Sequence, residues 1–148
     1  MSDIDEMIKK ADALFELSKH EETLDCVNKI LEIEPDNYDA LNYKAGALHF
    51  LHQYEEEIDC LNRLLEIEPD NASHYQLKGK ALFDLSNDNA AIDHMLDMHP
   101  EAMPESTTYS FAESLVCFNK ALEIDPDNAE ALSYQQMLKQ YLQKINTT

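Results

Sequence analysis

Three nearly identical ten-residue stretches constrain this chain more than any other feature of its sequence. NKILEIEPDN begins at Asn28, NRLLEIEPDN at Asn62 and NKALEIDPDN at Asn119. Counted in sequence positions, the first spacing is therefore 34 (62 − 28) and the second is 57 (119 − 62). A period of this length indicates a repeat protein, in which each unit is one small supersecondary element.

Each copy carries a helical pattern into a proline. Proline lacks the N–H that a helix interior needs, and it pushes the residue before it out of the helical region. The Asp-Asn pair that follows can cap a new helix by accepting hydrogen bonds from the first free N–H groups. Each copy therefore predicts the end of one helix and the start of the next.

The helices that follow PDN, and the one that opens the chain, share a pattern of their own. Two large residues flank a small one at i, i+4 and i+7, which places all three on one face; the triplets are Met7-Ala11-Leu14, Leu41-Ala45-Leu48 and Tyr75-Gly79-Leu82. The small residue allows a second helix to approach closely. Each unit is thus predicted to be two antiparallel helices of roughly fourteen residues, joined by short turns at Ser18 and His52. A pair this small buries its apolar faces only by stacking on others.

This pattern resembles the tetratricopeptide repeat. The helix-turn-helix period of 34, the small residues at the helix contact, the aromatics Tyr54 and Phe111 that open second helices, and the closing proline carry the resemblance. The chain departs from it at Met7 and Leu41, where the family often has Trp, and at Thr23, Glu57 and Ser114, where it favours Ala. We interpret Glu57 as a side chain that snorkels out to water. The resemblance implies an all-α, right-handed α-solenoid of about three helix pairs.

We expect one domain over residues 1–148, with units at 4–37, 38–71 and 72–128 and a C-terminal capping helix at about 129–145. The second spacing is longer than the first by 23 (57 − 34), which predicts an insertion at about 87–109 inside the third unit. Its first half is expected to form a short helix and its second half a loop, with the next helix beginning at about Phe111. In an alternative arrangement, the short helix pairs with Ala72–Leu85 and the later helix is unpaired.

The charge balance bears on the class of partner. Thirty acidic residues against eleven basic ones give a formal charge of −19. Nucleic acid and anionic membrane surfaces are disfavoured as partners because binding to them depends on Lys and Arg. The start of the chain has no signal-peptide pattern and no apolar run is long enough to span a bilayer, so we expect a cytoplasmic protein.

No pattern in the sequence predicts catalysis, a cofactor or a metal. Cys26, Cys60 and Cys117 share one repeat position and are expected to be packing residues. His49 and His52 lie at i, i+3 but have no second ligand cluster at a fixed spacing. The chain has no Gly-rich phosphate loop and no nucleophile motif. We therefore predict a non-enzymatic protein.

In proteins that this chain resembles, the first helix of each pair lines a concave groove that binds a peptide segment. By helical phase, the residues expected to face that groove are Ile8, Asp12, Phe15, Asn42, Tyr43, His49, Phe50, Gln76, Lys80, Phe83, Tyr134 and Tyr141. Aromatic residues are typical anchors in such surfaces. In the alternative, half of these aromatics belong to the core and the insertion fills the groove.

The predicted function is an adaptor or scaffold that binds a neutral or basic peptide segment of a partner protein. The alternative is a structural module that forms a homo-oligomer through the insertion or the convex face. Relatives that bind the acidic tails of heat-shock chaperones resemble one another in a basic clamp, and here the matching positions are Ile8, Asp12, Tyr43, Ser73 and Leu77. Because the clamp is absent and the chain is acidic, we expect that it does not bind an acidic chaperone tail.

Overall fold

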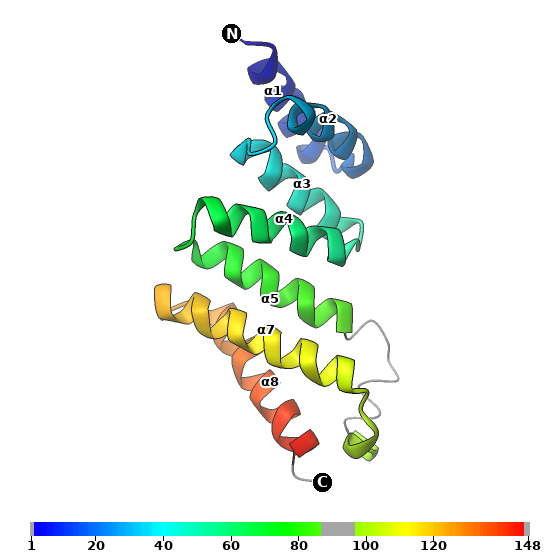
Figure 1. The fold of residues 1–148 in the computed structure, drawn as a ribbon, viewed down its shortest axis with the longest axis vertical. Helices are drawn as coiled ribbons and strands as arrows, with labels where there is room; N and C mark the ends of the chain where they lie inside the picture. Colours follow the sequence, from blue (N-terminus) through cyan, green and yellow to red (C-terminus); the bar gives the residue numbers. More distant parts are fainter. Residues whose placement is uncertain (1, 87–96, 147–148) are drawn as a thin grey trace. The chain divides into compact units, whose positions relative to one another are not determined.

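A computed structural model describes residues 2–86 and 97–146 of the chain (Figure 1). These residues form seven α-helices and one short 3-10 helix, and they contain no strand. The expected all-α class is confirmed. The chain divides into two compact units, Met1–Pro69 (unit 1) and Asp70–Thr148 (unit 2). The single domain expected over residues 1–148, with its repeat boundaries, stays a prediction.

Unit 1 consists of two helix pairs. Its helices are α1 (Asp3–Glu16), α2 (His20–Ile33), α3 (Tyr38–Phe50) and α4 (Tyr54–Ile67). Each helix packs against the next one along the chain, and α1 also contacts α3. Ala11, Val27, Ile30 and Ala40 are fully buried where α1, α2 and α3 meet. Three helices therefore share one core in this unit.

The two turns inside the helix pairs have the same geometry. Ser18 and His52 occupy the same repeat position and adopt left-handed backbone, with φ of 59° and 58°. After α1, the Ser18 N–H donates to the Phe15 carbonyl at 2.9 Å and the Lys19 N–H donates to the Leu14 carbonyl at 2.9 Å. This pair of bonds is the Schellman motif, which satisfies the last carbonyls of a helix. The same motif follows α3, so both pairs reverse direction in the same way.

The PDN signature ends one helix and caps the next, as predicted. The side-chain oxygens of Asn37, Asn71 and Asn128 each accept the backbone N–H three residues on, at 3.0, 3.2 and 3.0 Å. The helix before each proline ends two residues ahead of it, at Ile33, Ile67 and Ile124. The repeated letters therefore specify the helix boundaries locally, before any packing is considered.

Unit 2 contains α5 (Ala72–Ser86), the 3-10 helix η1 (Pro100–Ala102), α7 (Glu105–Ile124) and α8 (Ala129–Asn146). In this unit α7 packs against both α5 and α8. Phe111, Phe118, Ala121 and Leu138 are fully buried between these helices.

The loop expected up to Tyr109 is wrong in its second part. Helix α7 begins at Glu105, six residues before the predicted start at Phe111, and η1 precedes it. The reason is burial: Met103 and Thr107 are each 8% exposed, and Met103 packs into the core of unit 2. The Pro104 carbonyl also accepts the N–H groups of Thr107 and Thr108 at 3.0 and 3.1 Å, which starts the helix early.

Most of the short helix expected in the first half of the insertion falls on residues 87–96, which lie outside the described residues. Beyond them, the partner of α5 is clear. The Ser114 hydroxyl of α7 donates to the Gly79 carbonyl of α5 at 2.6 Å, and both residues are buried. Helix α7 thus contacts α5 through the small residue that the sequence pattern places at the helix contact.

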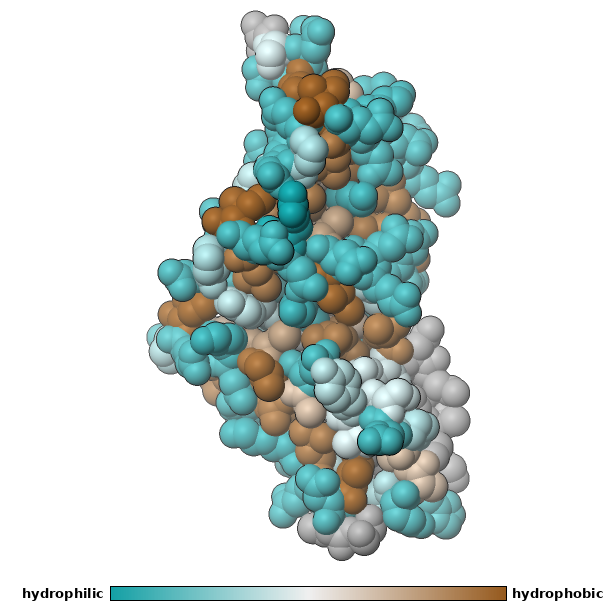
Figure 2. Space-filling model, in the orientation of Figure 1, coloured by the Kyte–Doolittle hydropathy of each residue, from teal (hydrophilic) through white to brown (hydrophobic). Residues whose placement is uncertain are grey.

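The face of the molecule drawn in Figure 2 is mainly hydrophilic. On the face drawn in Figure 2, hydrophobic residues form separate small patches among hydrophilic ones. Among the described residues, no helix combines the length and the apolar character that crossing a membrane requires.

We predict that even a methyl side chain at Gly79 destabilises the protein. A Cβ at this position would lie 2.9 Å from the Phe118 ring, which is fully buried and stacked on Tyr134 at 4.8 Å. Since that ring has no room to move, we expect Gly79→Ala to lower the free energy of unfolding by about 1–3 kcal/mol. Urea titration followed by far-UV circular dichroism measures the change.

Gly46→Ala is the matched control. A Cβ there would also lie 2.9 Å from a ring, that of Phe15, but this ring is only half-buried, so its outer edge can give by a few tenths of an ångström without leaving its aromatic neighbours. Alanine also favours the helix by about 1 kcal/mol. We therefore expect a change below about 1 kcal/mol for this variant. Equal losses for both variants would contradict the explanation by packing.

Candidate functional site

The predicted groove residues are divided between the two units. Unit 1 holds Ile8, Asp12, Phe15, Asn42, Tyr43, His49 and Phe50, on α1 and α3. Unit 2 holds Gln76, Lys80, Phe83, Tyr134 and Tyr141, on α5 and α8. The two sets have different surroundings, so each unit makes its own local surface.

In unit 1 the aromatic side chains of α1 and α3 meet. The Phe15 ring lies edge-on to Tyr43 at 5.8 Å and to Phe50 at 6.0 Å, measured between ring centroids. These distances are within the range in which aromatic pairs attract one another. Phe50 is nevertheless 56% exposed. The three rings, called here the aromatic patch, therefore present apolar surface that is fixed in place but still accessible.

Sequence reasoning missed one member of this cluster, His20. Its ring stacks on Phe50 with centroids 4.7 Å apart and planes 10° apart, and it lies edge-on to Phe15 at 5.4 Å. His20 opens α2 at the position that Tyr54 occupies in α4, one repeat period later. Alignment of the two repeats, which pairs His20 with Tyr54, could thus have identified His20 as the ring that begins the second helix of its pair.

Tyr43 carries the polar end of the aromatic patch. Its hydroxyl donates to Asp12 Oδ1 at 2.7 Å. This hydrogen bond, then burial, and then the charges of Asp12, Asp39 and Glu16 raise the pKa of Tyr43 to about 12. The phenol therefore stays neutral near pH 7, and the patch is bordered by carboxylates.

His49 and Glu57 form a pair that the sequence interpretation did not foresee. Glu57 is 1% exposed, so the interpretation that it snorkels out to water is wrong. Its carboxylate oxygens lie 3.2 and 3.3 Å from His49 Nδ1. The His49 ring also lies edge-on to Phe50 at 5.6 Å. A buried carboxylate thus holds a ring at the border of the aromatic patch.

The repeat register shows what is unusual about this pair. The first repeat of unit 1 contains the same two positions, and they are occupied there by Phe15 and Thr23. Thr23 is fully buried, and its hydroxyl donates to the Lys19 carbonyl at 2.8 Å. The second repeat therefore replaces a phenylalanine and a threonine together by a histidine and a glutamate. A buried carboxylate needs a partner, which explains why the two replacements occur as a pair.

The predicted groove residues of unit 2 are largely engaged by α8. The Lys80 ammonium lies 2.8 Å from Glu130, which also accepts from the Gln76 amide at 2.5 Å. Phe83 is 7% exposed and packs edge-on to Tyr134 at 5.5 Å, while Tyr141 lies 5.9 Å from the buried Phe111. Side chains of α8 therefore contact this face of α5, and the aromatics of unit 2 contribute to its core.

Asn42 and Ile8 complete the predicted set in unit 1. Both are half-buried, and the Asn42 amide donates to the Tyr38 carbonyl of its own helix at 3.3 Å. Neither shares an aromatic contact with the patch. They are therefore not part of it.

The three cysteines are free and buried. Burial raises the pKa of the Cys60 thiol to about 11 and, in the same way, that of Cys117 to about 11. Both thiols are therefore protonated and poorly nucleophilic near neutral pH. Within residues 2–86 and 97–146, no three His, Cys, Asp or Glu side chains are grouped so that they could hold a metal ion.

Comparison with known proteins identifies the fold. No family model matches the sequence, and no curated protein does either. Among solved structures, the first tetratricopeptide domain of Spaghetti (RPAP3) bound to the HSP90 peptide SRMEEVD is 18% identical; the match covers 95% of this chain and 93% of that one, with a TM-score of 0.71.

Two further structures are similar. MamA, from residue 41 to its end, from Desulfovibrio magneticus RS-1 is 17% identical, with a TM-score of 0.74 and coverage of 98% of this chain and 69% of that one. The Sgt2 tetratricopeptide domain from Aspergillus fumigatus is 14% identical, with a TM-score of 0.71 and coverage of 100% and 84%. At these identities the matches establish the tetratricopeptide fold and nothing finer.

One expectation needs correction. The exclusion of an acidic chaperone tail relied on the absent basic clamp and on the net charge. A domain that shares this fold over 95% of the chain was solved with the acidic peptide SRMEEVD, so the exclusion does not hold. The physical reason is that net charge sums over the whole surface, whereas a peptide contacts a few local side chains within a Debye length.

The His49–Glu57 pair leads to a double-mutant prediction. His49→Phe removes the ring nitrogen beside a buried carboxylate, and we expect it to lower the free energy of unfolding by about 3 kcal/mol. The double variant His49→Phe, Glu57→Thr restores the combination of Phe15 and Thr23, and we expect it within about 1 kcal/mol of the parent. Urea titration of the parent, both single variants and the double variant measures the coupling. Additive losses in the double variant would refute the paired replacement.

Proposed function

We propose that this chain, which has the tetratricopeptide-repeat fold, is a non-enzymatic adaptor that binds a peptide segment of a partner protein at the aromatic patch of unit 1. One observation carries the proposal. The rings of Phe15, Tyr43 and Phe50 hold one another in place, and yet Phe50 is 56% exposed. A fixed aromatic surface loses little conformational entropy on binding and makes a good anchor.

The border of the patch supports a neutral or basic segment. Asp12, Glu16 and Asp39 surround the Tyr43 hydroxyl closely enough to raise its pKa. A lysine or arginine of the segment would pair with these carboxylates while an adjacent apolar or aromatic side chain lies on Phe50. Since Arg and Lys also stack favourably on aromatic faces, both kinds of contact can be made by neighbouring residues of one peptide.

The arrangement in unit 2 supports unit 1 as the binding unit. Helix α8 engages Gln76, Lys80 and Phe83 of α5, so a peptide would have to displace it to reach them. We therefore restrict the proposed site to Asp12, Phe15, Tyr43, His49 and Phe50, together with His20.

A cytoplasmic location stays a prediction.

Self-association is the second candidate, through the insertion or the convex face. Residues 87–96 of the insertion lie outside the described residues, and so its contribution rests on the sequence alone. Measuring mass by light scattering over a dilution series separates the two functions: an adaptor of this kind keeps one mass, whereas a self-associating module loses mass on dilution.

A random-peptide display selection tests the adaptor. We expect enriched peptides to combine an apolar or aromatic residue with a neighbouring lysine or arginine. Tyr43→Ala, Phe50→Ala should weaken their binding by about tenfold or more, because anchor residues carry most of the binding energy. Fluorescence anisotropy with the enriched peptides measures the loss.

Tyr109→Ala is the matched control for this experiment. Tyr109 is 65% exposed and lies on α7 in unit 2, so its removal deletes an accessible aromatic ring that does not belong to the patch. We expect it to leave peptide binding unchanged. Equal binding by the parent and the Tyr43, Phe50 double variant, or no enrichment at all, would refute the proposed site.

A further inference from the structure

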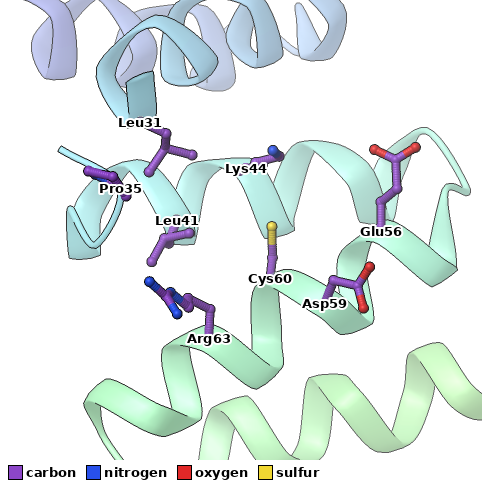
Figure 3. Close-up of a pocket in the computed structure, with 8 residues that line it drawn as sticks. All are labelled: Leu31, Pro35, Leu41, Lys44, Glu56, Asp59, Cys60 and Arg63. Atoms are coloured by element: carbon purple, nitrogen blue, oxygen red, sulfur yellow. The ribbon is translucent and has the colours of Figure 1, made fainter. Parts of the chain in front are cut away.

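Unit 1 also contains two hollows whose walls are built from equivalent residues of its two repeats. The larger, of about 500 Å³, lies between α2, α3 and α4, and its wall includes Lys44, Glu56, Asp59, Cys60 and Arg63 (Figure 3). We call it the central hollow. The smaller, of about 400 Å³, lies between α1 and α2, with Lys10, Glu22, Asp25, Cys26 and Lys29 in its wall. We call it the N-terminal hollow.

Each charged or thiol residue of one hollow has its counterpart in the other, displaced by one repeat period. Lysine matches lysine, glutamate matches glutamate, aspartate matches aspartate and cysteine matches cysteine, while Lys29 corresponds to Arg63. In unit 2 the equivalent positions carry Lys78, Glu113, Cys117 and Lys120, with Val116 in place of the aspartate. Six of the eleven basic residues of this very acidic chain therefore occur at two repeat positions, a concentration that composition does not explain.

The floor of each hollow is small and neutral. The side chains of Cys26 and Cys60 are each 7% exposed, and the Cys26 thiol donates to the Met7 carbonyl at 3.3 Å. Figure 3 shows the Cys60 sulfur pointing from α4 toward α3, between the two ends of the central hollow. Glu56 and Asp59 lie together at one end, and Arg63 lies at the other with Leu31, Pro35 and Leu41.

The charges around the central hollow are only partly paired. Arg63 lies 2.5 Å from Asp36 and 3.4 Å from Glu66, so its charge is offset within the protein. In the part of the chain that the structure describes, no ion pair engages Lys44, Glu56 or Asp59. The hollow thus offers two exposed carboxylates and one half-buried ammonium group to a partner.

The spacing between the hollows fits an extended peptide. Helix α2 contributes to both hollows, with Leu31 on the central one and Cys26 on the N-terminal one, and so it forms the ridge between them. Equivalent points of the two hollows lie one repeat apart, as Lys10 of α1 and Lys44 of α3 do, and α1 contacts α3. Packed helices lie about 8–10 Å apart. An extended chain in the polyproline II conformation has three residues per turn and advances about 3.1 Å per residue, so every third side chain points to the same face and lies about 9 Å further along, which connects equivalent points of the two hollows.

We propose that the two hollows form a second docking surface, for an extended segment of a partner protein in which lysine or arginine recurs at every third residue. The basic side chains pair with Glu22 and Asp25 in one hollow and with Glu56 and Asp59 in the other. Lys10 and Lys44 donate to the carbonyl oxygens of the segment. This surface is separate from the aromatic patch, which gives an adaptor of this kind two sites for partner segments.

The test uses a fluorescein-labelled peptide of about twelve residues that repeats Lys-Ser-Thr, a length that spans both hollows in extended form. A second peptide has the same composition, with its lysines gathered at one end. We expect the periodic peptide to bind the full chain at least about fivefold more tightly in fluorescence anisotropy at low salt. Glu56→Gln, Asp59→Asn should weaken its binding by about tenfold.

Lys44→Met separates docking from general attraction to an acidic protein. Removing a positive charge makes the chain more acidic, so unspecific attraction predicts tighter binding, whereas loss of a hydrogen-bond donor to the peptide predicts binding about threefold weaker. Glu105→Gln, Asp125→Asn in unit 2 makes the same change in net charge as the Glu56, Asp59 variant and should leave binding within about twofold of the parent. Tyr43→Ala, Phe50→Ala should also leave it unchanged, so that failure here is distinguishable from failure of the aromatic patch.

Cys60 provides an independent readout. We expect the bound periodic peptide to slow the reaction of this thiol with maleimide, because the peptide covers the hollow and the thiol lies at its floor. Equal affinity for the two peptides, tighter binding by the Lys44 variant, or equal losses in the unit 2 control would each overturn the proposal.

Discussion

The close contact between the two helices of each pair is the constraint on which the rest of the structure depends. It requires a small residue on the first helix, supplied by Ala11, Ala45 and Gly79, and a compatible side chain on the second. At Gly79 the approach is close enough for the buried Ser114 hydroxyl to bond the backbone carbonyl at 2.6 Å. Since protein interiors pack at nearly crystalline density, this contact leaves no space for a larger group. The faces turned away from it are free to vary and can carry function.

Variation within this frame is most informative where two positions change together. The first repeat has Phe15 and Thr23 where the second has His49 and Glu57. The glutamate is buried like the threonine, but it needs a polar partner there, and His49 Nδ1 supplies one at 3.2 Å. The result is a repeat with the same backbone and a different surface, because His49 faces Phe50 where the patch meets solvent. A comparison of equivalent positions in two repeats therefore shows which side chains change together.

The aromatic side chains of the two units differ in their exposure to solvent. In unit 1 the rings on α1 and α3 pack on one another and leave Phe50 accessible. In unit 2 the side chains of α8 contact α5: Glu130 pairs with Lys80, and Tyr134 lies edge-on to Phe83 as Tyr43 does to Phe15. The two units differ in the next aromatic ring, because Phe50 of unit 1 is 56% exposed whereas Tyr141 of unit 2 is half-buried beside Phe111. The aromatics of unit 2 therefore contribute to its core, and those of unit 1 leave one ring accessible.

Local chemistry explains how much of the fold could be predicted. Helix boundaries depend on proline, on asparagine caps and on turn geometry, which act over a few residues, and so the sequence by itself determined the helices, their pairing period and the small residues at the contact. Helical phase also grouped Phe15, Tyr43 and Phe50, whose rings lie together in unit 1. The early start of α7 at Glu105 was not predicted, because it depends on the burial of Met103 and Thr107, which is a long-range effect.

Only the tertiary structure decided which candidate residues are accessible. Phe83 and Phe50 have similar apolar side chains at neighbouring repeat positions, yet one is 7% exposed and the other 56%. Burial depends on what packs above a side chain, and residues distant in sequence supply that cover. The snorkelling predicted for Glu57 was wrong for the same reason, since His49 makes its burial tolerable. Helical phase specifies the direction of a side chain, whereas its environment is a property of the assembled helices.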